Sequence, residues 1–539
     1  MSTSPDESRL RAALEAGEAI PLSPAGVVEY RSRGRVLVIG GEEAREFAPR
    51  LRPELRPQVL LTGDEQEPGV PVISLGGREL CIEGHLGAFT VTVGERGHPG
   101  REVIECDLIL DLDIPHHLQA RLPPPGYLRA VPGEPSALDL AETELKGLVG
   151  RFEKPRYVDY DPARCAHGRS GKAGCRRCLD ACPAEAIVSR GERIQVDPYR
   201  CQGGGACAAV CPSGAIRYTT PPLAELGERI RAALRSWCEG GGDPPVVALV
   251  SEGDRPSLDP LPGRVLPFTL EEVAGAGPEL WLAALAWGAS AVRLVSPSCP
   301  DAIDAGLAAP LRMIGEILDA LGLPAGCVAL VTPERVADGD RMPLIRPAAF
   351  APLGDKRQLL FLAVGHLHDQ APRAPAMTEL SAGAFFGAAF VDGRRCTLCM
   401  ACAGACPGHA LQAGGEQPAL RFIEANCLQC GICTRTCPEE AIWISPRLLF
   451  DPEARRLPRT LHEEPPFECV ACGTPFATRR VIENTLRRLA AHPMFASERA
   501  RRRLMMCEAC RVADIVQDRE AISAGLAEAG SPLSGGEPR

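Results

Sequence analysis

The chain has 539 residues, of which 24 are cysteine, and it carries 59 basic against 69 acidic side chains. This length corresponds to three or four domains of about 100 to 200 residues each. The net charge of −10 argues against nucleic-acid binding, which requires a basic surface. The first 20 residues contain no apolar signal segment, and the most apolar stretch, residues 279–295, is shorter than the roughly 20 residues that span a bilayer. We therefore expect no membrane span and a cytoplasmic location, where cysteines stay reduced and can bind metal.

The N-terminal region, residues 1–150, is predicted to form an α/β domain. Apolar runs such as RVLVIGG, QVLLTG and LILDL alternate with charged or proline-rich turns, a pattern typical of strands. The run VLVIGG resembles the first strand of a dinucleotide-binding domain but lacks the G-x-G-x-x-G motif, so we do not expect bound NAD or FAD. His116 and His117 follow the acidic strand end DLDIP, where a loop role is favoured over metal ligation.

Residues 151–222 hold the first group of cysteines. This region contains two similar hexapeptides, CPAEAI and CPSGAI, and the same unit occurs twice more as CPGHAL and CPEEAI. A proline directly after a cysteine ends a short helix, and the residues beyond it favour a short strand. Two modules, each internally duplicated, are therefore predicted. The cysteines of the first module are Cys165, Cys175, Cys178, Cys182, Cys201, Cys207 and Cys211.

A small α/β domain is predicted for residues 240–340, because strand and helix patterns alternate there after the linker CEGGGDPP. The run ALAWGASAVRLVSPSC resembles part of the delta subunit of hydrogenases that pair with heterodisulfide reductase. The resemblance implies a [2Fe-2S] cluster, but only Cys299 and Cys327 are available in this region, so we expect none. The domain is interpreted as a docking scaffold, and residues 341–390 as a connecting segment.

The second module, residues 391–446, contains two complete motifs. RCTLCMACAGACP and NCLQCGICTRTCP both have the spacing Cys-x2-Cys-x2-Cys-x3-Cys-Pro. This spacing resembles the bacterial two-cluster ferredoxins, in which the fourth cysteine of each motif ligates the other cluster. A pair of zinc knuckles is the alternative, although zinc sites use their thiolates as two separated pairs. The resemblance implies two [4Fe-4S] clusters, one on Cys396, Cys399, Cys402 and Cys437 and one on Cys427, Cys430, Cys433 and Cys406.

In the first module the same resemblance implies a [4Fe-4S] cluster on Cys165, Cys175, Cys178 and Cys211, with the loop AHGRSGKAG inserted after Cys165. In the second motif, CQGGGACAAVCP, Gly204 occupies a cysteine position and leaves only Cys201, Cys207 and Cys182. This resembles the seven-iron ferredoxins, in which such a gap leaves a [3Fe-4S] cluster. The alternatives are a [4Fe-4S] cluster whose fourth iron takes water or a partner ligand, and a site that has lost its metal. The inserted loop, with His167, Arg169 and Lys172, is expected to be solvated rather than to tune the cluster.

The C-terminal segment, residues 460–515, is predicted to be helical and to bind metal in a zinc-ribbon-like arrangement. Two Cys-x2-Cys pairs form the thiolate set of structural zinc, and a spacer of 34 residues with helical periodicity can return the chain to the metal. A rubredoxin-type iron centre, a further cluster and unpaired thiols are the alternatives. The arginines of this segment are expected on a solvated helix face, and residues 516–539 form a tail. The four cysteines are Cys469, Cys472, Cys507 and Cys510.

The expected fold class is thus multidomain α/β and α+β, with two ferredoxin-like modules joined by small alternating α/β domains. About four clusters, without a flavin, nicotinamide or molybdenum-pterin motif, resemble a polyferredoxin-like electron-transfer subunit. This resemblance implies the relay of single electrons between a redox donor and an acceptor, such as a formate dehydrogenase or hydrogenase complex. A redox- or oxygen-sensing regulatory or assembly protein is the alternative. A third possibility is a catalytic subunit in which an iron without a protein ligand, near Gly204, acts as a Lewis acid. Catalysis of this kind would need a convergent group of acid and base side chains, which the sequence does not supply.

Overall fold

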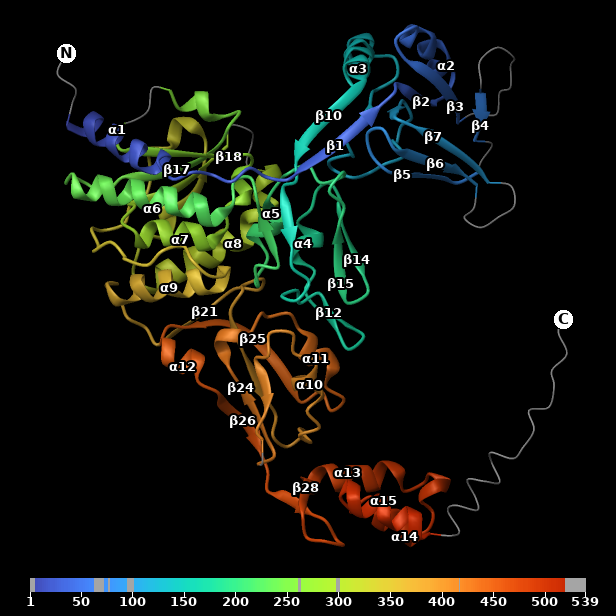
Figure 1. The fold of residues 1–539 in the computed structure, drawn as a ribbon, viewed down its shortest axis with the longest axis vertical. Coiled ribbons are helices and arrows are strands. Elements are labelled where there is room, and N and C mark those ends of the chain that lie inside the picture. The colour runs from blue at the N-terminus through green and yellow to red at the C-terminus, as the bar shows by residue number, and fades with distance from the viewer. Residues whose placement is uncertain are drawn as a thin grey trace, which may run out of the picture. The chain divides into compact units, whose positions relative to one another are not determined.

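The computed structural model describes residues 5–62, 72–75, 78–94, 101–259, 263–296, 301–415 and 417–518 (Figure 1). Cys299 and residues 519–539 of the predicted tail lie outside this part. The chain forms two compact units: residues 1–385 with 446–452, and residues 386–445 with 453–539. Among the described helices, none combines the length and the apolar character that crossing a membrane requires.

A parallel sheet of five strands is the centre of the N-terminal region (Figure 1). In spatial order the strands are β4 (Val72–Ser74), β3 (Arg56–Leu61), β2 (Arg35–Gly40), β8 (Leu108–Asp111) and β9 (Tyr127–Arg129). Val36 and Val38 of β2 belong to one hydrophobic cluster, whereas Leu37 and Ile39 belong to another. The run RVLVIGG is apolar throughout because a parallel strand is covered on both faces.

Helices cover one face of this sheet and a second, antiparallel sheet covers the other. The covering elements are α2 (Glu42–Phe47), the 3-10 helix η1 (Ala48–Leu51), α3 (Pro135–Gly147), β5 (Leu80–Glu83), β6 (Phe89–Val93) and β7 (Glu102–Cys106). Cys106 is buried in the cluster between the two sheets, and Cys81 is partly buried. The inner strand of the antiparallel sheet, β6, buries alternate residues, as expected for a strand with one covered face.

The first helix, α1 (Pro5–Glu18), packs outside this N-terminal sheet. It lies along α6 (Leu223–Glu239), and Arg9 Nε donates a hydrogen bond of 3.1 Å to the carbonyl of Gly240. Helix α1 therefore contacts the later α/β region rather than the rest of residues 1–150.

The first module consists of short strands and one-turn helices, and a two-stranded ribbon leads into it. These elements are β1 (Val27–Ser32), β10 (Gly150–Pro155), β11 (Val158–Tyr160), β12 (Gly168–Arg169), β13 (Lys172–Ala173), α4 (Arg177–Asp180), β14 (Ile187–Arg190), β15 (Arg193–Val196), α5 (Ala206–Ala209) and β16 (Ile216–Tyr218). Strand β1 pairs with β10, β11 with β16, and β14 with β15, all antiparallel. The inserted loop forms the small hairpin β12–β13.

The region after the first module contains a parallel four-stranded sheet in the order β18-β17-β19-β20. Its elements after α6 are β17 (Val246–Ser251), η2 (Arg255–Leu258), β18 (Val265–Leu270), η3 (Val273–Gly275), α7 (Pro278–Ala286), β19 (Ala291–Val295), α8 (Asp301–Ala320), η4 (Ala325–Cys327), β20 (Val328–Val331) and η5 (Pro333–Arg335). Every residue of α7 is buried, which explains why this helix has no polar face.

We expected residues 341–390 to be a connecting segment. They instead form a helix and a strand that pack against neighbouring elements. Helix α9 (Lys356–Asp369) lies against α7, and Leu360, Ala363 and Val364 of α9 are fully buried. The strand β21 (Met377–Glu379) pairs with residues 447–449. This segment therefore completes the hydrophobic layer over α7.

The second module repeats the plan of the first, with two one-turn helices and short strands. Its elements are β22 (Gly387–Val391), α10 (Ala401–Gly404), β23 (Leu411–Ala413), β24 (Ala419–Phe422), η6 (Glu424–Asn426), α11 (Ile432–Thr436), β25 (Ile442–Leu449), α12 (Pro452–Arg456) and β26 (Arg459–Glu463). Strand β24 pairs with both β23 and β26. Phe422 and Leu420 of β24 lie with several of the cysteines in one buried cluster.

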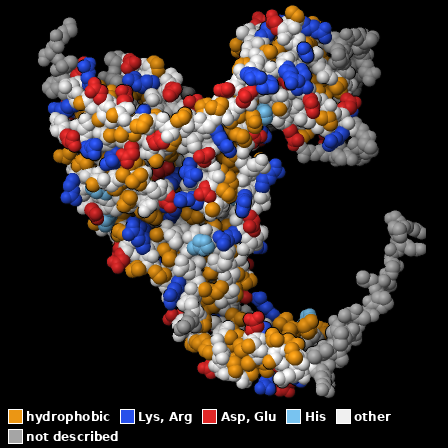
Figure 2. Space-filling model, in the orientation of Figure 1, with side chains coloured by type: hydrophobic (Ala, Val, Ile, Leu, Met, Phe, Trp, Pro, Cys, Tyr) orange, Lys and Arg blue, Asp and Glu red, His pale blue; other side chains and the backbone are white. Residues whose placement is uncertain are grey.

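The C-terminal segment is a hairpin followed by helices. The elements are β27 (Pro466–Glu468), β28 (Pro475–Thr478), α13 (Arg479–Leu489), η7 (Pro493–Phe495), α14 (Glu498–Arg503) and α15 (Glu508–Gln517). Figure 2 shows hydrophobic side chains gathered on the surface of this segment, where Met494, Val512 and Val516 are exposed.

Candidate iron-sulfur and metal sites

The four Cys-Pro hexapeptides adopt one backbone conformation. In each of them the third residue after the cysteine has a left-handed φ, namely 49° at Glu185, 68° at Gly214, 52° at His409 and 47° at Glu440. The chain then enters β14, β16, β23 or β25. The repeated sequence unit is therefore a repeated structural unit, with a sharp turn that separates each fourth cysteine from the strand after it.

In the second module the second cysteine of each motif lies between two left-handed residues. Leu398 and Met400, with φ of 54° and 60°, flank Cys399, and Gln429 and Gly431, with φ of 50° and 75°, flank Cys430. A one-turn helix, α10 or α11, begins directly afterwards and carries the third cysteine. These turns present successive thiols of each motif from a compact loop.

The thiols of the second module gather in the two groups that the ferredoxin resemblance implies. Burial, followed by the charges of Cys396, Cys399 and Cys437, raises the pKa of Cys402 to about 12. Burial, followed by the charges of Cys427, Cys430 and Cys406, raises the pKa of Cys433 above its ordinary value. In both groups the fourth thiol comes from the other motif. Without metal the thiols of Cys402 and Cys433 are protonated at neutral pH, so cluster binding there must release protons.

In the first module one complete group of four thiols forms around Cys178. Burial, followed by the charges of Cys211, Cys175 and Cys165, raises the pKa of Cys178. The structure thus brings Cys165 back to the other three despite the inserted loop. The guanidinium Nη1 of Arg177 lies 3.6 Å from the Sγ of Cys175 and donates toward it.

His167 holds the inserted loop in place. Its side chain is buried, with Nδ1 at 2.9 Å from the carbonyl of Cys175 and Nε2 at 2.7 Å from the Oγ of Ser189. The expectation of a solvated loop is therefore wrong for His167, whereas Lys172 is exposed as expected. The burial of His167 fixes the loop to the backbone of one proposed ligand.

The remaining thiols of the first module form a group of three, which we call the three-thiolate group: Cys182, Cys201 and Cys207. Cys207 is buried, and burial together with the charges of Cys201 and Cys182 raises its pKa well above the ordinary value. The same thiols line a small cavity together with Gly203, Gly204 and Gly205. Its lining lacks a fourth thiol.

Gly204 occupies the position of a second cysteine in three dimensions as well as in sequence. Its neighbours Gly203 and Gly205 have φ of 82° and 69°, the same left-handed pair that flanks Cys399 and Cys430. Gly204 is exposed, and a Cβ built on it would meet no atom within 4 Å. In contrast, a Cβ on Gly205 would lie 2.2 Å from the backbone nitrogen of Gly275. The backbone therefore does not require glycine at position 204, and a cysteine there would fit.

Lys154 of β10 lies beside the three-thiolate group. Its Nζ donates hydrogen bonds to the carbonyls of Tyr199, at 2.8 Å, and Cys201, at 2.6 Å. Burial lowers the pKa of Lys154 to about 8, which leaves it mostly charged at neutral pH. The cysteine spacing gave no indication of this residue, because it lies 47 positions before Cys201.

Hydrogen bonds to sulfur occur at the second module as well. The side-chain amide of Gln429 lies 3.4 Å from the Sγ of Cys427, and the backbone N–H of Ala441 donates to the Sγ of Cys437 at 3.3 Å. Such bonds stabilise a thiolate and tune the potential of a bound cluster. Gln429 lies inside the motif, but the spacing of the cysteines does not identify it. A donor set of grouped thiols, most of them buried or partly buried, fits iron-sulfur clusters.

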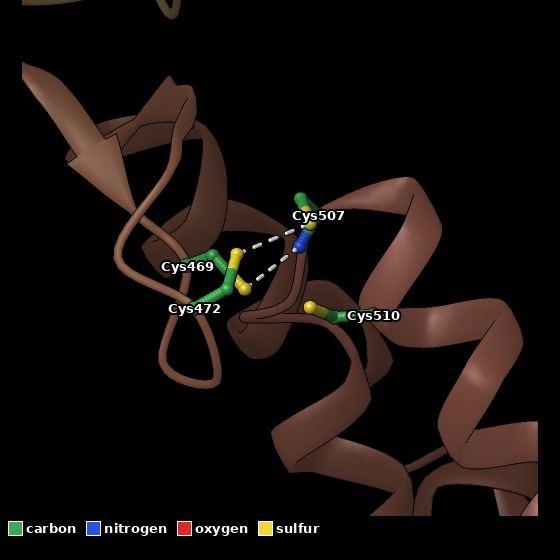
Figure 3. A group of neighbouring side chains, drawn as sticks. All are labelled: Cys469, Cys472, Cys507 and Cys510. Atoms are coloured by element: carbon green, nitrogen blue, oxygen red, sulfur yellow. Dashed lines mark hydrogen bonds between the residues drawn. The ribbon is translucent and has the colours of Figure 1, made fainter.

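The four C-terminal cysteines converge on one point (Figure 3). Each offers a sulfur, and the four sulfurs lie within 4.8 Å of one another. Cys469 and Cys472 lie on the loop of the β27–β28 hairpin, whereas Cys507 precedes α15 and Cys510 lies in its first turn. The second pair thus lies at the start of a helix. In a zinc ribbon it would lie on a second hairpin, so the predicted zinc-ribbon-like arrangement is not the one observed.

The geometry at these four cysteines matches a single metal ion. The sulfurs of Cys472 and Cys507 are 3.7 Å apart, and thiolates around a tetrahedral ion with bonds of about 2.3 Å lie about 3.8 Å apart. Although desolvation opposes it, the backbone N–H groups of Cys507, Ala471 and Cys472 lower the pKa of Cys469 to about 6. Cys469 is therefore prepared to act as a thiolate ligand at neutral pH.

Helix α13 joins this four-cysteine segment to the second module. Arg488 forms an ion pair of 2.8 Å with Glu439, and Arg480 donates to the carbonyl of Cys396 at 3.3 Å. Arg488 is exposed, as the expected solvated helix face requires, whereas Arg480 is only partly exposed. Both arginines attach the segment to the second module, and Arg480 does so next to one of the proposed cluster ligands.

A third group of potential ligands lies at the end of β8. Oxygen and nitrogen atoms of Asp111, Asp113 and His117 lie within 4.8 Å of one another. Asp111 accepts hydrogen bonds from the backbone N–H of His117 at 2.7 Å and from the hydroxyl of Tyr127. His117 Nε2 lies 2.8 Å from a carboxylate oxygen of Asp113. These bonds support the loop role expected of His117, because they fix the turn after the strand.

Comparison with known proteins agrees with this geometry. Two stretches, residues 172–215 and 395–441, match the family of 4Fe-4S dicluster domains. The first match begins after Cys165, so the displaced ligand lies outside it. A comparison with curated proteins finds no match for the sequence. The predicted resemblance is confirmed at both places: the chain is a multidomain α/β protein with two iron-sulfur domains of the ferredoxin type.

Proposed function

We propose that this chain relays single electrons between a redox enzyme, such as a dehydrogenase or hydrogenase, and an acceptor. The observation that carries the proposal is the occurrence of two 4Fe-4S dicluster domains, each with its thiols gathered in two neighbouring groups. When bound, an iron-sulfur cluster accepts and releases one electron at a time. A reducing compartment such as the cytoplasm would keep the remaining thiols available.

The proposed ligands are the fifteen cysteines of the two modules. Three groups of four would hold [4Fe-4S] clusters, and the three-thiolate group would hold a [3Fe-4S] cluster or an incompletely ligated [4Fe-4S] cluster. The protein's contribution is to bury the thiols, to cross the fourth ligand between motifs and to donate N–H groups to sulfur. Crossed ligands tie the two halves of each module together, so cluster binding and folding are coupled.

At the C-terminal cysteines we propose a structural zinc ion. The short distances between the sulfurs favour one metal ion over a further cluster, whose ligands would be more widely separated. All four ligand positions would be filled by protein, which is the arrangement of a structural rather than a catalytic site. The ion would hold the β27–β28 hairpin and the start of α15 together.

The test is anaerobic purification followed by measurement of iron, sulfide and zinc and by EPR before and after reduction with dithionite. Three four-iron clusters and one three-iron cluster correspond to about 15 irons per chain, and the C-terminal site corresponds to about one zinc. An EPR signal of an oxidised three-iron cluster that disappears on reduction is expected. Iron near eight per chain would refute the proposal for the first module.

The substitution Gly204→Cys tests the three-thiolate group directly. A Cβ at this position meets no atom within 4 Å, so the new thiol can be accommodated. The three-iron signal should be replaced by the reduced-state signal of a [4Fe-4S] cluster. Gly204→Ser is the matched control, since a hydroxyl of similar size is a poorer ligand. An unchanged signal in Gly204→Cys would show that position 204 does not face the cluster.

Redox or oxygen sensing is the second candidate. It is favoured by the exposure of Gly204, which would leave one face of a bound cluster accessible to small molecules. The distinguishing measurement is the rate of cluster loss in air. Sensing requires that the three-thiolate centre responds rapidly and reversibly, whereas an electron relay requires only that all four centres are reduced and reoxidised by a partner.

A further inference from the structure

The side chain of Lys154 is fixed next to the three-thiolate group by several contacts. Besides its hydrogen bonds to the carbonyls of Tyr199 and Cys201, the ammonium lies 4.9 Å from the centre of the Tyr30 ring. Tyr30 is buried, and its hydroxyl also donates to the carbonyl of Tyr199 at 2.6 Å. The positive charge is therefore held at the backbone of a proposed ligand and is partly shielded from water.

The charge of Lys154 is not balanced by an ion pair. In the part of the chain that the structure describes, no carboxylate lies within 4.0 Å of its Nζ. Basic side chains beside the second module are paired: Arg480 with Glu464 at 3.0 Å, and Arg488 with Glu439 at 2.8 Å. The nearby charges that act on Lys154 are those of Cys201 and Asp197.

A positive charge without a directly paired carboxylate affects the energy of reducing a nearby cluster. Reduction adds one negative charge to a cluster, and a nearby ammonium stabilises that added charge more strongly in a medium of low polarity. Lys154 is also the cation that acts on the Cys201 thiol, against the negative charges of Cys182 and Asp197. We propose that Lys154 sets the reduction potential of the centre held by Cys182, Cys201 and Cys207, and raises it. This inference rests on the proposed function, because it requires that a cluster is bound there.

The experiment is a redox titration of the full-length protein at pH 7, followed by EPR. The signal of the three-thiolate centre is assigned first, by its loss in Cys207→Ser. Lys154→Met removes the charge, Lys154→Gln removes the charge but keeps a hydrogen-bond donor, and Lys154→Arg keeps the charge. Lys172→Met is the matched control, because Lys172 is an exposed lysine of the same module.

We expect both neutral variants to lower the midpoint potential of this centre. The ratio of reduced to oxidised centre at a fixed solution potential should fall by about tenfold, which for one electron corresponds to about 59 mV. Lys154→Arg and Lys172→Met should stay near the wild-type value, and the centres of the second module should not change.

The possible outcomes separate the two proposals. If wild type and variants bind the cluster but the midpoint is the same in Lys154→Met and Lys154→Gln, the inference about Lys154 is wrong. Equal shifts in Lys154→Gln and Lys154→Arg would overturn it too, because they would trace the effect to altered contacts rather than to charge. If wild type shows no EPR signal that depends on Cys207, the proposed cluster itself is refuted. Should Lys154→Met fail to bind a cluster, Lys154→Gln decides the question.

Discussion

Two adjacent glycines of the first module should respond oppositely to the same substitution, alanine. Gly205 has a φ of 69°, and a Cβ there would lie 2.2 Å from the nitrogen and 2.4 Å from the Cα of Gly275. Gly204 has no left-handed φ, and its Cβ would meet nothing within 4 Å. The two residues are adjacent in one loop and line the same cavity as the proposed ligands, so they form a matched pair.

The cost of Gly205→Ala has two parts. A left-handed conformation costs a residue with a side chain about 1 to 2 kcal/mol. The overlap with the backbone of the buried η3 can be relieved only by moving that segment, which costs about 1 to 3 kcal/mol. We therefore expect Gly205→Ala to lower the free energy of unfolding by about 2 to 5 kcal/mol. Gly204→Ala should change it by less than about 1 kcal/mol, because it creates no contact and restricts the unfolded chain.

The assay is thermal unfolding under anaerobic conditions, followed by circular dichroism, together with the iron content of each purified variant. Gly205→Ala should unfold at a lower temperature and lose iron from the first module, while Gly204→Ala should keep the wild-type iron content. The reasoning is refuted if Gly205→Ala matches the wild type in both measurements, or if Gly204→Ala is the more damaging of the two.

Three further predictions concern single sites outside this loop. Cys469→Ser should remove the zinc, from about one ion per chain to none, while the iron content stays within error; loss of both metals together would contradict separate sites. Lys356→Met removes the buried partner of Glu279, which lies 3.3 Å away, and should destabilise the protein by about 3 to 5 kcal/mol in urea unfolding. Lys356→Met combined with Glu279→Leu should recover part of that loss, and equal values for single and double variants would argue against the ion pair. Arg293→Met removes the donor that four carbonyl groups share, one of them, at Cys327, in a buried hydrogen bond, and should cost about 1 to 3 kcal/mol; a loss below about 0.5 kcal/mol would contradict this.

Much of the architecture could be anticipated because buried parallel strands and cysteine motifs leave strong local patterns. The apolar runs around residues 35 and 246 form strands of two parallel sheets, since both of their faces are covered. The packing partner of α1 could not be anticipated, because its contact with α6 joins segments that are far apart in the chain. Helix α9 was missed for a related reason. Its composition is mixed, and its apolar residues are buried by contacts with the apolar helix α7, which lies far from it in the chain.

The candidate sites were predictable to the extent that their residues lie within motifs. Cysteine spacing identified the thiol groups and the gap at Gly204, because several ligands of one cluster must come from one short loop. The spacing did not reveal residues that approach the proposed ligands from elsewhere in the chain. Lys154 reaches Cys201 from β10 across 47 positions, and Arg480 reaches Cys396 from α13 across 84. His167 was expected in solvent, and only its contacts with Cys175 and Ser189 show that it is buried.

By itself, the sequence determines that this chain carries two iron-sulfur domains. Thiols at fixed spacing with a following proline encode two iron-sulfur domains, because ligand identity and loop length are local properties of the chain. Only the tertiary structure decides the environment of each proposed centre: that Gly204 is exposed to solvent, that Lys154 lies against the backbone of Cys201, and that the C-terminal segment attaches beside Cys396. Charge, burial and solvent access depend on residues brought together from distant parts of the chain, and these are the quantities that set a reduction potential.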